Sequence, residues 1–195
     1  MKVRGVIALL LIGMFTASGL CQQSELEEKI RAVFLQELRT PDLLVKLRQL
    51  SDDKKIVAVL MNLATKNRLA KERTSDFVVL NGAVASLGEL RATSANDLLS
   101  SLLTDSKVHE NVRALAARSL GLINPEGNKQ TLLRALAPSE HLQIRVYAAE
   151  GLAQTRDAGA LRALERYSRE EKDSHVRQQF EKAARTMRAN GVRPN

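Results

Sequence analysis

The C-terminal half of the chain repeats one helical pattern at a fixed spacing of 32 residues. Val112-Arg113 is followed by paired alanines and by Leu120-Gly121, and two further copies open at Ile144-Arg145 and Val176-Arg177. A recurrence at roughly 20–50 residues is typical of folds that stack one structural unit on the next. This repeat restricts the architecture more strongly than any other feature of the sequence.

The repeated unit is a pair of helices. Apolar residues recur every three or four positions within each copy, and shorter apolar stripes lie between the copies, at residues 98–103, 132–136 and 160–164. A pair of this length cannot bury its own apolar stripe, whereas stacked pairs share a continuous core. We therefore predict an all-α fold, an α-solenoid in which antiparallel helix pairs stack into a superhelix.

The repeat register is clear only in part of the chain. A helix over 77–90 contains Leu87-Gly88, so we assign the helical repeats to residues 71–189. Residues 22–70 are expected to form N-terminal helices of unassigned register, one over 24–39 and one starting at Thr40-Pro41, where Thr40 would be the N-cap. Residues 190–195 are expected to be a disordered basic tail.

Several repeat positions are interpreted as structural. An aliphatic residue precedes an arginine near the start of each second helix and should face inward, while the arginine should pair with an acid such as Asp105, Glu140 or Asp173 across a turn. These structural positions are Val112, Arg113, Ile144, Arg145, Val176 and Arg177.

The pattern resembles the HEAT-repeat family, in the short form found in phycobilisome lyases. That form has L-x-x-L-x-D followed by V-R-x-x-A-A-x-x-L-G. The best match to it in this chain is Leu103-Thr104-Asp105 together with residues 112–121. The resemblance extends over residues 76–189 and implies a solenoid that serves as a binding scaffold. The last copy departs from the form, with Phe180-Glu181 in place of paired alanines, and we interpret it as a capping repeat.

The N-terminus predicts export. Lys2 and Arg4 precede an apolar run over 6–15 and small residues over 16–19, which is the pattern of a secretory signal. We assign residues 1–21 to this signal and expect a periplasmic or secreted protein. An uncleaved membrane anchor remains an alternative, as does acylation of Cys21, although Leu20 and Ser18 match a lipoprotein signal poorly.

No catalytic, cofactor-binding or metal-binding set emerges from the sequence. His109 and His141 are 32 residues apart, but His175 is out of register. The HEAT-repeat enzyme deoxyhypusine hydroxylase holds di-iron with several His-Glu pairs, and His109-Glu110 is the one such pair in this chain. The sole cysteine lies in the signal region, and the ten glycines are too scattered for a phosphate loop. We predict no enzymatic activity and no cofactor.

The candidate binding residues are those at which the repeats differ. Second helices line the concave face of HEAT arrays, where Arg118, Glu150 and Lys182 occupy equivalent positions. Their alternating charges favour a protein or peptide partner. The net charge of +8 is not gathered into a basic run and there is no tryptophan, which argues against nucleic acid. An enzyme or cofactor binder of HEAT type and an accessory subunit of an envelope complex are the alternative functions.

The export hypothesis predicts where the mature chain begins. N-terminal sequencing of protein purified from its native source should start at Leu20, or at Gln22 if cleavage follows Cys21. An N-terminus at Met1 would indicate a retained anchor, and an acylated Cys21 would indicate a lipoprotein.

Overall fold

The computed structural model describes residues 21–36 and 42–193, so the predicted signal lies outside them up to residue 20. The described residues contain helices and no β-strand, beginning with a helix over 21–36. The later elements are α2 (Leu43–Leu50), α3 (Asp53–Lys66), α4 (Ser75–Glu89), the 3-10 turn η1 (Thr93–Ala95), α5 (Asn96–Thr104), α6 (Glu110–Ile123), α7 (Pro125–Arg134), α8 (Leu142–Leu152), α9 (Ala158–Glu170) and α10 (Ser174–Ala189).

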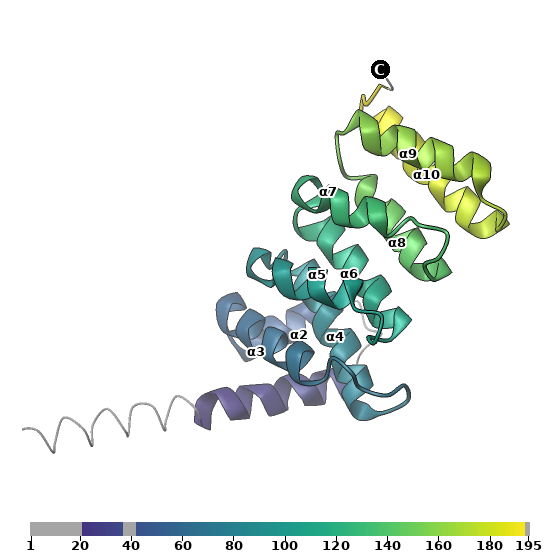
Figure 1. The fold of residues 1–195 in the computed structure, drawn as a ribbon. Helices are drawn as coiled ribbons and strands as arrows, with labels where there is room; N and C mark the ends of the chain where they lie inside the picture. Colours follow the sequence, from purple (N-terminus) through teal and green to yellow (C-terminus); the bar gives the residue numbers. More distant parts are fainter. Residues whose placement is uncertain (1–20, 37–41, 194–195) are drawn as a thin grey trace, which may run out of the picture.

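The helices pack as successive pairs, as the sequence predicted. Figure 1 shows α3 with α4, α5 with α6, α7 with α8, and α9 with α10 following one another along the array. The fold is therefore an all-α solenoid. Because α3 packs against α4 as a first helix, the paired arrangement begins upstream of residue 71, where the sequence did not reveal it.

The second helices of the pairs form the inner layer. Helices α4, α6, α8 and α10 pack directly on one another, whereas the first helices α5, α7 and α9 make few contacts across pairs. Closer spacing along one side curves a stack toward that side. The second helices therefore line the concave side of the array, and the first helices cover the outside.

Small residues allow this close approach between second helices. A Cβ atom on Gly121 would lie 2.3 Å from the Cα atom of Gly151, and one on Gly88 would lie 2.5 Å from the Oγ of Ser119. Ala153 and Ala183 hold the equivalent places one repeat later. We call this contact the small-residue seam, formed by Gly88 with Ser119 and by Gly121 with Gly151.

The helix over 21–36 closes the N-terminal end of the stack. The ring of Phe34 packs where a Cβ on Gly82 of α4 would lie, and Arg31 pairs with Asp76 at 2.6 Å. The described part of this helix already includes the three residues before the predicted start at residue 24. Its predicted end at residue 39 and the Thr40-Pro41 helix start lie outside the described residues, and α2 begins at Leu43.

The C-terminal end differs from the predicted tail. Residues 190–193 form a helix-ending turn in which Gly191 has a φ of 86° and the Val192 N–H donates to the Met187 carbonyl at 3.0 Å. This arrangement satisfies the free carbonyls of α10, and the Val192 side chain is buried against the core. Residues 194–195 lie outside the described residues.

The small-residue seam should be intolerant of a single methyl group. We expect Gly121→Ala to lower the free energy of unfolding by about 1–3 kcal/mol, because a backbone atom of Gly151 blocks the new Cβ. Gly151→Ala should cost less, since its Cβ would lie 3.0 Å from the movable Leu132 Cδ1 and 3.1 Å from the Gly121 Cα, a looser contact than at Gly121. Urea unfolding of both variants would check the order. Alanine is otherwise the better helix former, so it should stabilise the helix wherever there is room for its Cβ. A Gly121→Ala protein as stable as wild type would therefore contradict the close backbone contact at Gly121.

Candidate protein-interaction surface

The aliphatic residues of the repeat lie in the core and the arginines bind the ends of first helices. Val112, Ile144 and Val176 are fully buried. Arg113 donates from Nε to the Leu103 carbonyl at 2.8 Å and Arg145 from Nε to the Leu136 carbonyl at 3.2 Å. Arg177 donates to the Glu171 carbonyl at 3.1 Å. Each arginine thus places positive charge at the negative end of the first helix of its own pair.

The same arginines connect each pair to the next. Arg113 pairs with Glu140 at 2.6 Å in the following α7–α8 turn, and Arg145 pairs with Glu171 in the α9–α10 turn. Glu140 was therefore correctly expected to pair with a repeat arginine, but Asp105 and Asp173 pair with none of the three. Asp105 pairs with Arg68 at 2.8 Å, and the Asp173 carboxylate accepts the Val176 N–H at 2.9 Å.

Through these contacts, the six structural positions hold the helix pairs of the array together. The Arg145 and Glu171 side chains are only 5% and 7% exposed, and Arg145 also lies 5.4 Å from the centre of the Phe180 ring. Their polar atoms are directed to carbonyls and carboxylates of the array itself. A ligand on the surface would have to compete with these internal contacts.

The structure separates the three candidate binding residues into two groups. Arg118 pairs with Glu89 of α4 at 2.9 Å, so its charge is balanced within the inner layer. Glu150 and Lys182 are exposed, and neither forms an ion pair with another residue that the structure describes. Together they line a shallow depression of about 220 Å³ between α8 and α10, with Ala153, Gln154, Gln179, Ala183 and Thr186.

The departure of the last repeat from the pattern coincides with this depression. Phe180 is fully buried at the position that Ala116 and Ala148 occupy in the preceding copies. Helices α8 and α10 contact each other less than α6 and α8 do. We attribute the wider separation to the larger Phe180 side chain, which packs beneath Arg145 and edge-on to Tyr167 at 6.3 Å.

Two of the three histidines, His109 and His141, act as helix caps. The Nδ1 atoms of His109 and His141 accept the N–H groups of Asn111 and Gln143, at 3.2 and 3.4 Å. His109 also packs edge-on against Phe77 at 4.8 Å. Within residues 21–36 and 42–193, no three His, Cys, Asp or Glu side chains gather closely enough to hold a metal ion.

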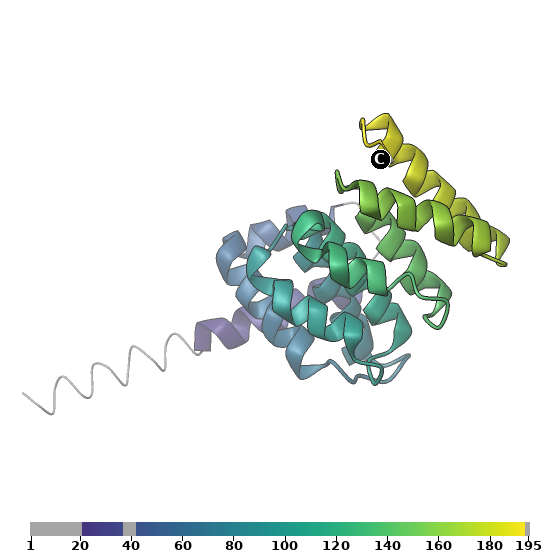
Figure 2. The ribbon, with the colours of Figure 1, turned by 45° about the horizontal axis from the view of Figure 1, so that its top comes forward.

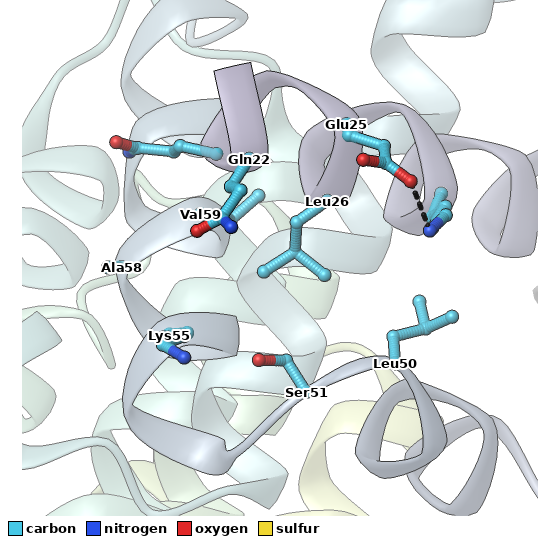
Figure 3. A pocket seen from close by; sticks show the side chains of 10 residues that line it. Gln22, Glu25, Leu26, Leu50, Ser51, Lys55, Ala58 and Val59 are labelled. Atoms are coloured by element: carbon cyan, nitrogen blue, oxygen red, sulfur yellow. Dashed lines mark hydrogen bonds and ion pairs between the residues drawn. The ribbon is translucent and has the colours of Figure 1, made fainter. Parts of the chain in front are cut away.

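A second concave region lies at the N-terminal end of the array. Figure 3 shows Leu26 and Leu50 facing a pocket of about 460 Å³ between the helix over 21–36, the end of α2 and the start of α3. Ser51 and Lys55 lie on its polar side, and Glu25 pairs with Lys29 at 2.6 Å near its edge. The pocket combines an apolar floor with a polar rim.

Two features of the array were missed in the sequence although they follow its 32-residue spacing. One is the partner side of the small-residue seam, Ser119 and Gly151. The other is a pair of asparagines, since buried Asn128 donates to Asn96 Oδ1 at 2.8 Å. Aligning every position of the copies, including the polar ones, could have found both.

The comparison with known families agrees with this architecture. Residues 106–185 match the family model for HEAT repeats. No curated protein gives a significant match to the chain. In the part of the chain that the structure describes, no helix is both long and apolar enough to cross a membrane.

The buried Arg145–Glu171 pair predicts a pH dependence of stability. Burial raises the pKa of Glu171, but hydrogen bonds from the Asp173 N–H and the Arg145 guanidinium outweigh it, so the pKa lies below its ordinary value of 4.5. A carboxylate with a lowered pKa contributes fully to folding stability at a pH above its ordinary pKa. This contribution is lost as the pH falls through the lowered pKa. We expect Glu171→Gln to cost about 3 kcal/mol at pH 7.

The difference in unfolding free energy between wild type and Glu171→Gln should therefore shrink below about pH 4.5. Urea unfolding at pH 7 and in acid would measure it. Glu140→Gln is the matched control, because its carboxylate is 27% exposed and should contribute less. A difference that stays constant with pH would contradict the role of the charged pair.

Proposed function

We propose that this array of HEAT repeats is an interaction scaffold without catalytic activity of its own, which binds a protein or peptide on its inner face. The observation that carries the proposal is the depression between α8 and α10, where exposed Glu150 and Lys182 differ in charge from their repeat equivalents. Solenoids of stacked repeats commonly present an extended concave surface to partners.

The charge pattern of the inner face supports a protein partner. The Arg118–Glu89 pair is balanced internally, so Glu150 and Lys182 are the charges left for recognition among the three candidate positions. Adjacent charges of opposite sign can fix the register of a bound chain. They do not form the continuous basic track that a nucleic acid would require.

We also propose export, on the basis of the predicted signal over residues 1–21. The folded array then acts in the periplasm or outside the cell. The helix over 21–36 packs directly on α4 through Phe34, which leaves little chain between this end of the array and residue 20. A retained anchor or an acylated Cys21 would therefore hold the N-terminal end close to a membrane.

The N-terminal pocket favours a second candidate, an accessory subunit of an envelope complex. Its apolar floor of Leu26, Leu50 and Val59 lies at the end of the array where such an anchor would attach. A lyase-like enzyme or cofactor binder is the remaining alternative. A stoichiometric metal or a visible chromophore in protein purified from its native source would support that alternative and contradict the scaffold.

A charge swap on the inner face tests the scaffold. Glu150→Lys combined with Lys182→Glu conserves net charge but reverses the pattern at the depression. We expect about a tenfold or greater loss of affinity for a partner recovered from the native envelope fraction, since reversed charges become repulsive at two positions.

The matched control swaps the exposed neighbours Lys71 and Glu72 in the α3–α4 turn, far along the chain from the depression. Lys71→Glu with Glu72→Lys should leave the affinity unchanged. Failure to recover any saturable partner, or an equal loss in both swapped proteins, would count against the inner face as the binding site.

A further inference from the structure

We propose that Asn190, in the turn that ends α10, is a site of spontaneous deamidation, and that this modification releases the turn from the core. The reaction consumes only water and takes place on the chain itself, so the inference is independent of the proposed scaffold function. The chain contains two Asn-Gly dipeptides, Asn81-Gly82 and Asn190-Gly191. The fold protects the first and leaves the second open to reaction.

Deamidation at an Asn-Gly dipeptide proceeds through a cyclic succinimide. The backbone nitrogen of the glycine attacks the Cγ atom of the asparagine and forms a new N–C bond. The side-chain amide leaves with the proton of the glycine N–H as ammonia. Water then opens the ring at either of its carbonyls, which yields aspartate or isoaspartate. Glycine favours the attack because it has no Cβ to crowd the ring.

Asn190 is exposed at one end of the array. Figure 2 shows its helix, α10, in the pair that lies at the opposite end from the helix over 21–36. The Asn190 side chain forms no hydrogen bond with another residue that the structure describes. Gly191 is also exposed, and apart from its chain neighbours no described atom lies within 4 Å of the place of a Cβ on it. Packing therefore does not obstruct the Asn190 carboxamide or the peptide bond that follows it.

The reaction requires a rotation at Asn190, and the turn opposes it only weakly. Asn190 has a ψ of 9°, which keeps its Cβ turned away from the Gly191 nitrogen. Two hydrogen bonds hold the turn beyond it: the Gly191 N–H donates to the Arg188 carbonyl and the Val192 N–H to the Met187 carbonyl, both at 3.0 Å. The ends of helices open at much lower free energy than their centres. The reactive conformation is therefore reached without unfolding the array.

Asn81 belongs to the same dipeptide in the middle of α4, where the fold prevents the reaction. Its Nδ2 donates to the Phe77 carbonyl at 2.8 Å, and its Oδ1 is buried. Gly82 is buried as well, with the Phe34 ring 2.6 Å from the place of a Cβ on it. Helix α4 packs against both α3 and α6. A rotation at Asn81 would break this helix near its centre and separate it from its neighbours.

Deamidation of Asn190 changes the turn in two ways. Either product places a carboxylate at the C-terminus of α10, where the helix dipole disfavours negative charge. In isoaspartate the main chain also runs through the former side chain, which inserts one more carbon atom before Gly191. The Val192 N–H then no longer meets the Met187 carbonyl, and the buried Val192 side chain leaves the core.

The test incubates the full chain in mildly alkaline buffer, folded in one sample and unfolded in guanidinium chloride in the other. Tryptic cleavage after Arg73, Arg91 and Arg188 places the two dipeptides in separate peptides, 74–91 and 189–195, for mass spectrometry. In the folded sample Asn190 should deamidate at least about tenfold faster than Asn81, because the centre of a packed helix rarely opens. In the unfolded sample the two rates should be similar, since both residues precede glycine.

Two variants separate the reaction from its consequence. Asn190→Gln should stay unmodified over the same incubation, because its longer side chain would have to close a larger ring. Freshly prepared Asn190→Asp carries the new charge without the extra backbone atom. It should keep the partial protection of the Val192 N–H against hydrogen exchange, measured by NMR, whereas the isoaspartyl protein should lose it.

Two results would overturn the deamidation site: an unmodified Asn190 in the folded sample, or equal rates at Asn81 and Asn190 there. An isoaspartyl protein whose Val192 N–H stays protected would overturn the release of the turn. Loss of that protection already in Asn190→Asp would assign the release to the charge and contradict the role of the lengthened backbone.

Discussion

The close contact between second helices is the constraint on which the rest of the array depends. At Gly121 and Gly151 the two backbones approach until no side chain fits between them, and at Gly88 the partner is Ser119, whose hydroxyl donates to the Val84 carbonyl at 2.9 Å. Because first helices contact each other little across pairs, this approach sets the curvature. It also determines which side chains reach the inner face.

Polar contacts then hold the pairs in register. The repeat arginines bind carbonyls at the ends of first helices and extend to acids in the next turn, so each arginine connects two neighbouring pairs. We expect the buried Arg145–Glu171 pair to make this edge sensitive to acid. At the last pair, Phe180 replaces the small residue of earlier copies, and the array there is more open.

The repeat period was sufficient to predict the all-α solenoid and the pairing of helices from α4 onward. It did not reveal the pairing of α3 with α4, because the preceding segment lacks the repeated motif and its packing is set by contacts such as Phe34 on Gly82. The candidate surface was predicted in part. Glu150 and Lys182 lie together, but Arg118 is balanced by Glu89, a contact between helices that spacing alone does not show.

The sequence by itself determined the helical period, the buried aliphatic positions and the charges carried by each repeat, because these depend on side-chain type and spacing along the chain. Only the tertiary structure decided which charges are paired, since ion pairs such as Arg113–Glu140 join residues 27 positions apart across two repeats. Whether a repeated charge is paired within the array or left exposed was therefore settled by packing between neighbouring pairs, because spacing along the chain does not say which side chains of two different pairs meet.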